Sequence, residues 1–184
     1  MGNGTIILAG ATGSLGRRIA KVLLERGAAV KALVRRSSAP DKVDELRKLG
    51  AEIAEVEFND VRNLTAACAG GSCIISALSG LRDVIVDTQT LLLDAAVKAG
   101  VPRFIPSDFA IDFTKLRPGT NRNLDLRREF HERLDKAPIS ATSILNGMFT
   151  DLLLGQAPII LFKLKRVVYW ENPDQLLDFT TMDN

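Results

Sequence analysis

The sequence has 184 residues, of which 46% are hydrophobic and 25% charged, with a formal net charge of +2. These values are typical of one globular domain with room for the beginning of a second, and so small a charge gives no support to nucleic-acid binding. No uninterrupted apolar stretch reaches the ~18 residues of a membrane span. No basic segment precedes the first apolar run, as it would in a signal peptide. We therefore expect a cytoplasmic protein with neither nucleic-acid nor membrane partners.

Metal binding is not expected either. The sequence holds one histidine and two cysteines, Cys68 and Cys73, and their separation matches no metal-ligand or redox motif. We expect Cys68 within a helix and Cys73 at the start of a strand, both as small residues of the core.

Apolar segments typical of strands alternate with segments of helical periodicity over the first 145 residues. The predicted strands are 5–9, 29–34, 51–58, 72–78, 103–107 and 140–145. The predicted helices are 14–26, 40–49, 61–69, 83–99 and 122–136. This alternation predicts an α/β fold with a doubly wound parallel sheet of the Rossmann type. Ligands of such sheets bind beyond the carboxyl ends of the strands, so we expect the binding residues in the loops that follow them.

The alternation ends after Gly155. The segments 158–170 and 176–181 are apolar and are interpreted as strands or as pieces of a hairpin. We expect a dinucleotide-binding domain over residues 1–150 and the beginning of a small C-terminal substrate domain over 151–184. The sequence is then a truncated or separately expressed piece; the alternative is a compact protein that ends at residue 184.

Three glycines lie between the first predicted strand and the first predicted helix, in "ILAGATGSLGRRIA". Gly10 permits a tight exit from the strand, Gly13 lets the backbone approach a pyrophosphate, and Gly16 lets the helix pack closely on the sheet. The helix N-terminus supplies free N–H groups and a partial positive charge. Thr12 and Ser14 add hydroxyl groups that can reach phosphate oxygens. The segment therefore predicts a site for a dinucleotide phosphate.

Arginines follow the second predicted strand where an NAD-binding fold carries Asp or Glu, ~20 residues past the glycines. Here the residues are Arg35 and Arg36, and Lys42 lies at the start of the next predicted helix, 40–49. A guanidinium suits a dianionic phosphate and does not replace a carboxylate on a ribose hydroxyl. The sequence therefore favours NADP over NAD.

Five segments occur in this order along the chain: "GATGSLG", "ALVRRSS", "RFIPSDFAIDF", "SATSILNGMFTDLL" and "LDFTTMDN". Together they resemble the corresponding segments of the NmrA-like and isoflavone reductase-like group of atypical short-chain dehydrogenases. The resemblance implies a Rossmann domain that binds NADP(H), followed by a small variable substrate domain. Members of that group continue well past the equivalent of residue 184, which agrees with a truncated sequence.

The resemblance also implies which residues bind the cofactor. Those of the phosphate turn are Gly10, Thr12, Gly13, Ser14, Leu15 and Gly16. Arg35 corresponds to the 2′-phosphate ligand, with Arg36 and Lys42 as further cationic candidates. Ser76, Ala77 and Leu78 end the fourth strand near the adenosine and ribose. The residues expected near the nicotinamide are Pro106, Ser107, Phe109, Asn146 and Phe149.

The sequence departs from the group where proton transfer is concerned. Ordinary short-chain dehydrogenases use a Tyr-x-x-x-Lys pair for proton transfer. This sequence has one tyrosine, Tyr169, and the position four residues after it is Pro173 rather than a lysine. Isoflavone reductase-like enzymes instead carry a lysine four residues before an Arg-Arg pair. Counting back from Arg127-Arg128 gives Asn123, which we expect to point inward. An amide donates no proton as an acid at neutral pH, so the catalytic group is not identified.

Other titratable side chains are interpreted as surface groups. Asp108, Asp112 and Lys115 follow the fifth strand and are candidate proton donors, but are expected to be surface charges. His131 lies well along a polar helix and is expected in solvent.

Two functions fit these features. One is an NADPH-dependent reductase of a small organic substrate, aromatic compounds included. The other is a non-catalytic NADP(H)-sensing regulator that acts on a protein partner, with Asn123 marking the lost lysine. A Rossmann domain for a different adenosine ligand is a third interpretation, against which Arg35 argues.

Overall fold

The computed structural model describes residues 4–183 except 155–158, 170–171, 175 and 177. Six parallel strands form the central sheet in the order β3-β2-β1-β4-β5-β6. Their bounds are β1 (Thr5–Ala9), β2 (Val30–Val34), β3 (Glu52–Glu55), β4 (Gly71–Ser76), β5 (Arg103–Ile105) and β6 (Ser140–Ala141). The strand order reverses next to β1, where β2 pairs with one side of it and β4 with the other. The predicted doubly wound sheet is therefore confirmed.

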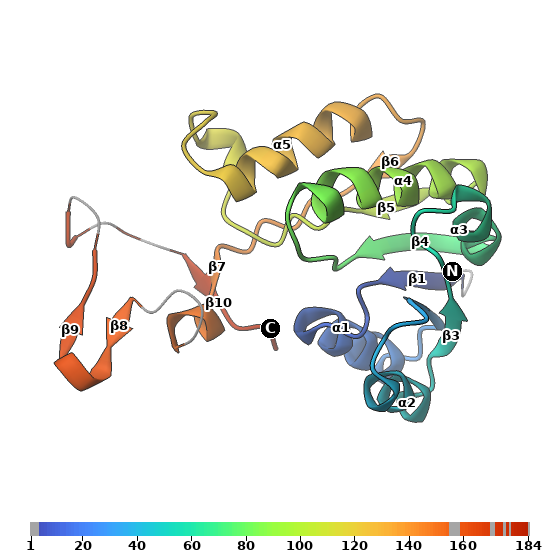
Figure 1. Ribbon diagram of the computed structural model, residues 1–184, viewed down its shortest axis with the longest axis horizontal. Helices are drawn as coiled ribbons and strands as arrows, with labels where there is room; N and C mark the ends of the chain where they lie inside the picture. The colour runs from blue at the N-terminus through green and yellow to red at the C-terminus, as the bar shows by residue number, and fades with distance from the viewer. Residues whose placement is uncertain (1–3, 155–158, 170–171, 175, 177, 184) are drawn as a thin grey trace.

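Helices cover both faces of the sheet. They are α1 (Ser14–Glu25), α2 (Pro40–Leu49), α3 (Val61–Cys68), α4 (Gln89–Lys98) and α5 (Arg122–Leu134). Figure 1 shows α1 and α2 on one face and α3, α4 and α5 on the other. Among the described residues, no helix is long and apolar enough to cross a membrane.

The core divides into two layers because successive strand residues face opposite sides. Ile7 of β1 packs with Phe104 of β5 and Phe130 of α5 in one layer. Leu8 of β1 packs with Ile75 of β4 and residues of α1 and α2 in the other. Burial on both faces explains why the strands have continuous apolar runs rather than alternating ones.

The sixth strand is much shorter than the predicted 140–145. Only Ser140 and Ala141 pair with β5, and the amide of Thr142 donates one further bond to the carbonyl of Phe104 at 3.1 Å. The next bond of a parallel ladder would come from the amide of residue 106. That residue is Pro106, which has no N–H, so the ladder stops there.

The fourth predicted helix, 83–99, has two parts. Residues Asp83–Thr88 form a π-helix, and α4 continues from it. The hydroxyl of Thr88 donates to the carbonyl of Asp83, five residues earlier, at 2.8 Å. A π-helical turn inside an α-helix is rare and is often found next to a functional site.

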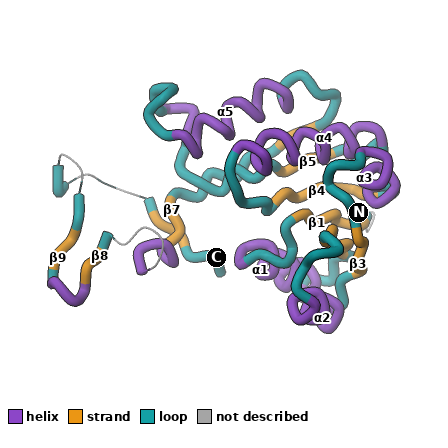
Figure 2. Tube along the Cα trace, in the orientation of Figure 1, coloured by secondary structure: helices purple, strands orange, loops and turns teal. Residues whose placement is uncertain are grey.

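Beyond β6 the chain leaves the sheet. The short strand β7 (Met148–Phe149) pairs in parallel with β10 (Phe179–Thr180). An antiparallel hairpin of β8 (Ile160–Leu161) and β9 (Arg166–Val167) lies apart from the sheet, as Figure 2 shows. The predicted hairpin and strand pieces are thus confirmed over their described residues, while positions 158, 170 and 177 lie outside them.

Candidate functional site

The turn between β1 and α1 is too tight for side chains at two of its glycines. Gly10 has a φ of +80°, and a β-carbon there would lie 2.4 Å from the carbonyl oxygen of Ala77. A β-carbon on Gly16 would lie 2.2 Å from the carbonyl oxygen of Gly10. At Gly13 the nearest atom would be that same oxygen, at 3.2 Å. Gly10 and Gly16 therefore allow close packing of the turn, whereas a β-carbon at Gly13 would require only a small shift of the neighbouring carbonyl.

The N-terminus of α1 is available to an anion. Gly13 precedes the helix, and no side chain caps it. The first helical hydrogen bond runs from the amide of Arg17 to the carbonyl of Gly13, at 3.0 Å. The backbone amides of the first turn, before Arg17, therefore have no partner within the helix and can donate to an external acceptor. The helix dipole favours an acceptor with negative charge.

Two cavities adjoin this turn. One of about 190 Å³ is lined by Thr12, Gly13, Ser14, Arg17 and Lys42. The other, of about 330 Å³, extends from the turn to the ends of β2 and β4. Its lining includes six of the predicted site residues: Gly10, Thr12, Gly13, Arg35, Ala77 and Leu78. The structure therefore brings the phosphate turn and the ends of two neighbouring strands together, and places Lys42 beside the turn.

A third cavity, of about 610 Å³, lies beyond the end of β2. Arg35 and Arg36 line it together with Phe58 and the π-helix residues Asp83 and Asp87. The guanidinium of Arg35 lies over the Phe58 ring, and Arg36 Nε lies 3.7 Å from Glu57 Oε1. Phe58 was not among the predicted site residues. The available signal was an aromatic residue at the carboxyl end of the predicted strand 51–58.

A fourth cavity, of about 440 Å³, lies between α1, the ends of β4 and β5, and the chain beyond β6. Its lining includes the predicted site residues Leu15, Phe109, Asn146 and Phe149. The C-terminal segment closes one side of it, where Arg18 Nε lies 2.6 Å from Asp183 Oδ1. No pattern in the sequence predicts that this segment returns to α1.

The remaining predicted residues are buried behind these cavities. The Ser76 side chain is fully buried, and its hydroxyl has no hydrogen-bond partner among the described residues. The Ser107 hydroxyl donates to the carbonyl of Leu78, and its amide donates to Gln89 Oε1 at 2.9 Å. Ser107 thus ties the end of β5, after Pro106, to the end of β4 and to α4. Direct cofactor contacts by these residues stay predictions.

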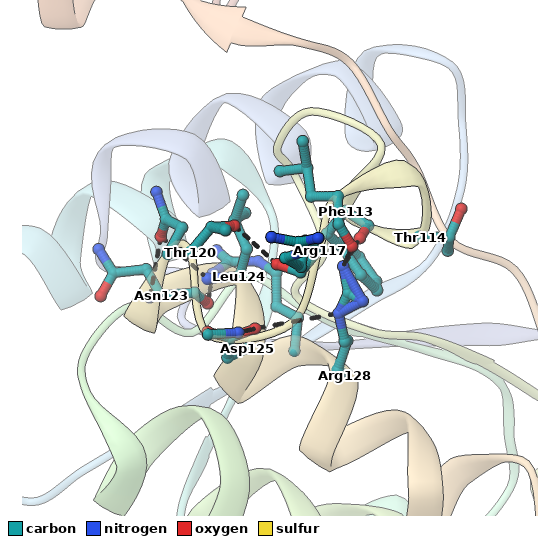
Figure 3. A network of polar contacts seen from close by, with 12 residues as sticks. Phe113, Thr114, Arg117, Thr120, Asn123, Leu124, Asp125 and Arg128 are labelled. Carbon is teal, nitrogen blue, oxygen red and sulfur yellow. Dashed lines mark hydrogen bonds and ion pairs between the residues drawn. The ribbon is translucent and has the colours of Figure 1, made fainter.

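The expectation that Asn123 points inward is wrong. Its side chain is exposed. Its backbone amide donates to Asn121 Oδ1 at 3.0 Å, and its backbone carbonyl accepts a hydrogen bond from the Arg127 side chain. Asn123 lies on the same side of α5 as the buried Phe130, but at the first turn of the helix this side is exposed. Figure 3 shows Asn123 at the edge of the polar network around Arg128, which donates to the carbonyls of Phe113 and Leu116.

Asp108 and His131 are also not surface groups, contrary to expectation. Asp108 is 0% exposed, and its Oδ2 lies 2.6 Å from His131 Nε2. The hydrogen bond with Asp108 raises the pKa of His131 above its ordinary value. Asp112 and Lys115 do lie at the surface, 3.2 Å apart. Among the described residues, no group of three or more His, Cys, Asp or Glu side chains could hold a metal ion.

Comparison with known proteins agrees with this architecture. The profile of the NmrA-like family matches residues 2–165. Pinoresinol reductase 2 of Arabidopsis thaliana is 32% identical over 155 residues, which cover 78% of this chain and 49% of the relative. A bifunctional pinoresinol-lariciresinol reductase of Forsythia intermedia is 31% identical over 169 residues, covering 84% and 54%. The chain thus spans about half the length of the curated relatives it matches.

Solved structures show the same fold. The structure described as "AtPrR2 with NADP+ and (+)pinoresinol" has a TM-score of 0.74 and 30% identity, covering 83% of this chain and 53% of that one. A crystal structure of isoflavone reductase has a TM-score of 0.80 at 20% identity, covering 98% and 62%, and is similar in fold. The resemblance found in the sequence is therefore confirmed, and the chain belongs to the NmrA-like family.

Proposed function

We propose that the chain binds NADP(H) and supplies the cofactor-binding part of an NADPH-dependent reductase of small organic molecules. The observation that carries the proposal is the row of cavities along the carboxyl edge of the sheet. It begins at Arg35 and Phe58, passes the glycine turn, and ends at Phe109 and Asn146. A relative of 30% identity has been solved with NADP+ and pinoresinol bound, which supports the same use of this edge here.

The 2′-phosphate is assigned to Arg35. This side chain is exposed, it lines both cavities at the adenosine end, and its guanidinium can donate two parallel bonds to a phosphate. Arg36 faces Glu57 and is therefore partly neutralised. Lys42 lies with Thr12 and Ser14 and would add positive charge beside the pyrophosphate.

The nicotinamide is assigned to the cavity of about 440 Å³. Leu15, Phe109 and Phe149 give it largely apolar walls, which exclude water from a hydride transfer. The Asn146 Oδ1 atom is buried and has no hydrogen-bond partner among the described residues, so it can accept one from a bound molecule. The bound cofactor would supply the hydride, while these residues bind and orient it.

Proton donation is not assigned to this chain. Asn123 is an exposed amide, and Lys115 is exposed and paired with Asp112. The contribution proposed for residues 1–150 is therefore binding and orientation, and that for 151–184 is the beginning of the substrate domain. An aromatic substrate suits the apolar walls, and the relatives named above act on pinoresinol or lariciresinol according to their names. The regulatory alternative finds no support among them.

The test is a titration of the chain with NADPH and NADH, followed by NADPH oxidation with pinoresinol and a panel of carbonyl and enone compounds. We expect tighter binding of NADPH than of NADH. Failure to bind either cofactor would overturn the proposal. Binding without oxidation of NADPH, followed by oxidation in Asn123→Lys, would favour the regulator instead.

A further inference from the structure

The loop that follows β5 is held to α5 by one buried polar contact. Asp108 lies in this loop, is 0% exposed, and places Oδ2 2.6 Å from Nε2 of His131 on α5. The loop also turns on itself, because the amide of Asp108 donates to the carbonyl of Pro106 at 2.8 Å. A buried carboxylate is stable only when it is paired and hydrogen-bonded, so this contact restrains the loop strongly.

Two further charged groups and two aromatic rings surround the pair. Arg127 lies one turn before His131 on α5, is half-buried, and interacts electrostatically with Asp108. On the far side of the imidazole, Asp135 Oδ1 lies 3.7 Å from Nδ1 of His131. The rings of Phe113 and Phe130 enclose the imidazole, with centroids 5.4 and 6.4 Å away. The carboxylates of Asp108 and Asp135 favour a protonated His131, while Arg127 interacts with Asp108.

The geometry excludes a hydrolase-type triad. Ser143 Oγ lies 3.5 Å from His131 Nε2, which is the same nitrogen that contacts Asp108. A triad needs the carboxylate and the hydroxyl on opposite nitrogens of the ring. The pair is therefore suited to positioning the loop, and not to activating the serine.

What the pair positions can be read from the neighbours of Asp108. Ser107 before it is tied to Leu78 and Gln89. Phe109 after it lines the cavity assigned to the nicotinamide, as does Leu15. Asp108 thus lies between a fixed residue and one that faces the cavity, and a shift of its side chain would move Phe109.

We propose that Asp108 and His131 are positioning residues that hold the loop after β5 in the shape required by the nicotinamide end of the cofactor. This inference rests on the proposed function. The hydrogen bond with Asp108 raises the pKa of His131, so the ion pair persists above the ordinary range of histidine and is lost as the pH rises further. Binding of the nicotinamide end should weaken over that same range.

The first experiment needs no cofactor. His131 is the one histidine of the sequence, so its imidazole signals in an NMR titration are unambiguous. We expect a pKa above about 6.5, the ordinary value, and a lower pKa in Asp108→Asn. An unshifted pKa, or one that Asp108→Asn leaves unchanged, would overturn the pairing.

The second experiment compares NADPH with 2′-phospho-ADP-ribose, which is NADP without the nicotinamide. Both ligands carry the same phosphates, so their own titration cancels in the ratio of dissociation constants. In the unmodified chain, we expect the dissociation constant of NADPH to increase relative to that of 2′-phospho-ADP-ribose as the pH rises above the pKa of His131. At lower pH, His131→Gln should weaken NADPH binding about fivefold or more, leave 2′-phospho-ADP-ribose unaffected, and remove the pH dependence of the ratio.

The matched control is Arg82→Gln. It breaks an ion pair between Arg82, which precedes the π-helix, and Glu129, which lies on α5 as His131 does. It should change neither dissociation constant. If the ratio is independent of pH in the unmodified chain, or if both ligands weaken equally in His131→Gln, the positioning role is wrong while the proposed function stands. If neither ligand binds at any pH, the proposed function itself fails, and the NMR titration still reports on the pair.

Discussion

The guanidinium carbon of Arg35 lies 5.7 Å from the centroid of the Phe58 ring, at the border of the two cavities assigned to the adenosine end. A cation over an aromatic face is attracted to it, so the ring orients the guanidinium without neutralising its charge. Arg36, in contrast, faces a carboxylate. The two adjacent arginines are therefore expected to differ in their effect on cofactor choice.

Arg35→Gln should lower the affinity for NADPH by about 1.5–3 kcal/mol, the range for a hydrogen bond to a charged group. The affinity for NADH should be nearly unchanged, because NADH has no 2′-phosphate. Arg36→Gln is the matched control and should have the smaller effect. Fluorescence titration of both cofactors measures the difference, and equal losses for NADPH and NADH would rule out Arg35 as the phosphate ligand.

Gly16→Ala should destabilise the fold by about 1–3 kcal/mol, since it forces an extra carbon into a packed site. The carbon would lie 2.2 Å from the Gly10 carbonyl oxygen, a backbone atom that cannot move without opening the turn. Gly50→Ala is the control: its φ is +100° but no atom lies within 4 Å of the added carbon, so only backbone strain remains. Urea unfolding compares the two, and loss of NADPH binding is expected only in Gly16→Ala.

Phe130→Ala should lower the free energy of unfolding by about 3–5 kcal/mol, as for other large-to-small changes in a core. The Phe130 side chain is 0% exposed, and its ring centroid lies 6.1 Å from the ring centroid of Phe104, so the change leaves a cavity between α5 and β5. Phe162 in the C-terminal hairpin is 66% exposed, and Phe162→Ala should have almost no effect. Similar midpoints of urea unfolding for the two variants would contradict the assigned core.

The stability of the chain should fall as the pH rises above the ordinary pKa of histidine. The pKa of His131 is raised in the folded state, so the folded chain holds its proton more tightly than the unfolded chain does. The resulting stabilisation is complete below about pH 6.5, the unfolded value, and is lost as the pH rises through the folded value. Urea unfolding as a function of pH measures this slope, which His131→Gln should flatten.

The sheet, the helices and the glycine turn could be predicted because each depends on local features of the sequence. Apolar runs, helical periodicity and glycines at fixed spacing are visible without knowing what lies opposite in the fold. The length of β6 could not be predicted this way. It depends on Pro106, which lies in a neighbouring strand's continuation and lacks the amide needed by the ladder.

The errors at the candidate site have a similar origin. Asp108 and His131 are 23 residues apart in the sequence, and each taken alone is typical of a polar surface. Asn123 has the helical phase of the buried Phe130, but at the first turn of α5 the chain covers Leu124 and Leu126 and leaves the Asn123 side exposed. Both cases need the tertiary arrangement, which a pattern within one helix does not contain.

Because Cys68 is buried, the reactivity of its thiol can be used to measure local unfolding of the chain. This thiol is 0% exposed in α3, and burial raises its pKa to about 11, so at neutral pH the folded chain presents almost no thiolate. The half-buried Cys73 of β4 differs from it in accessibility. A thiol reagent will therefore modify Cys68 only during excursions that detach α3 from the sheet, and the rate of that modification measures how often they occur.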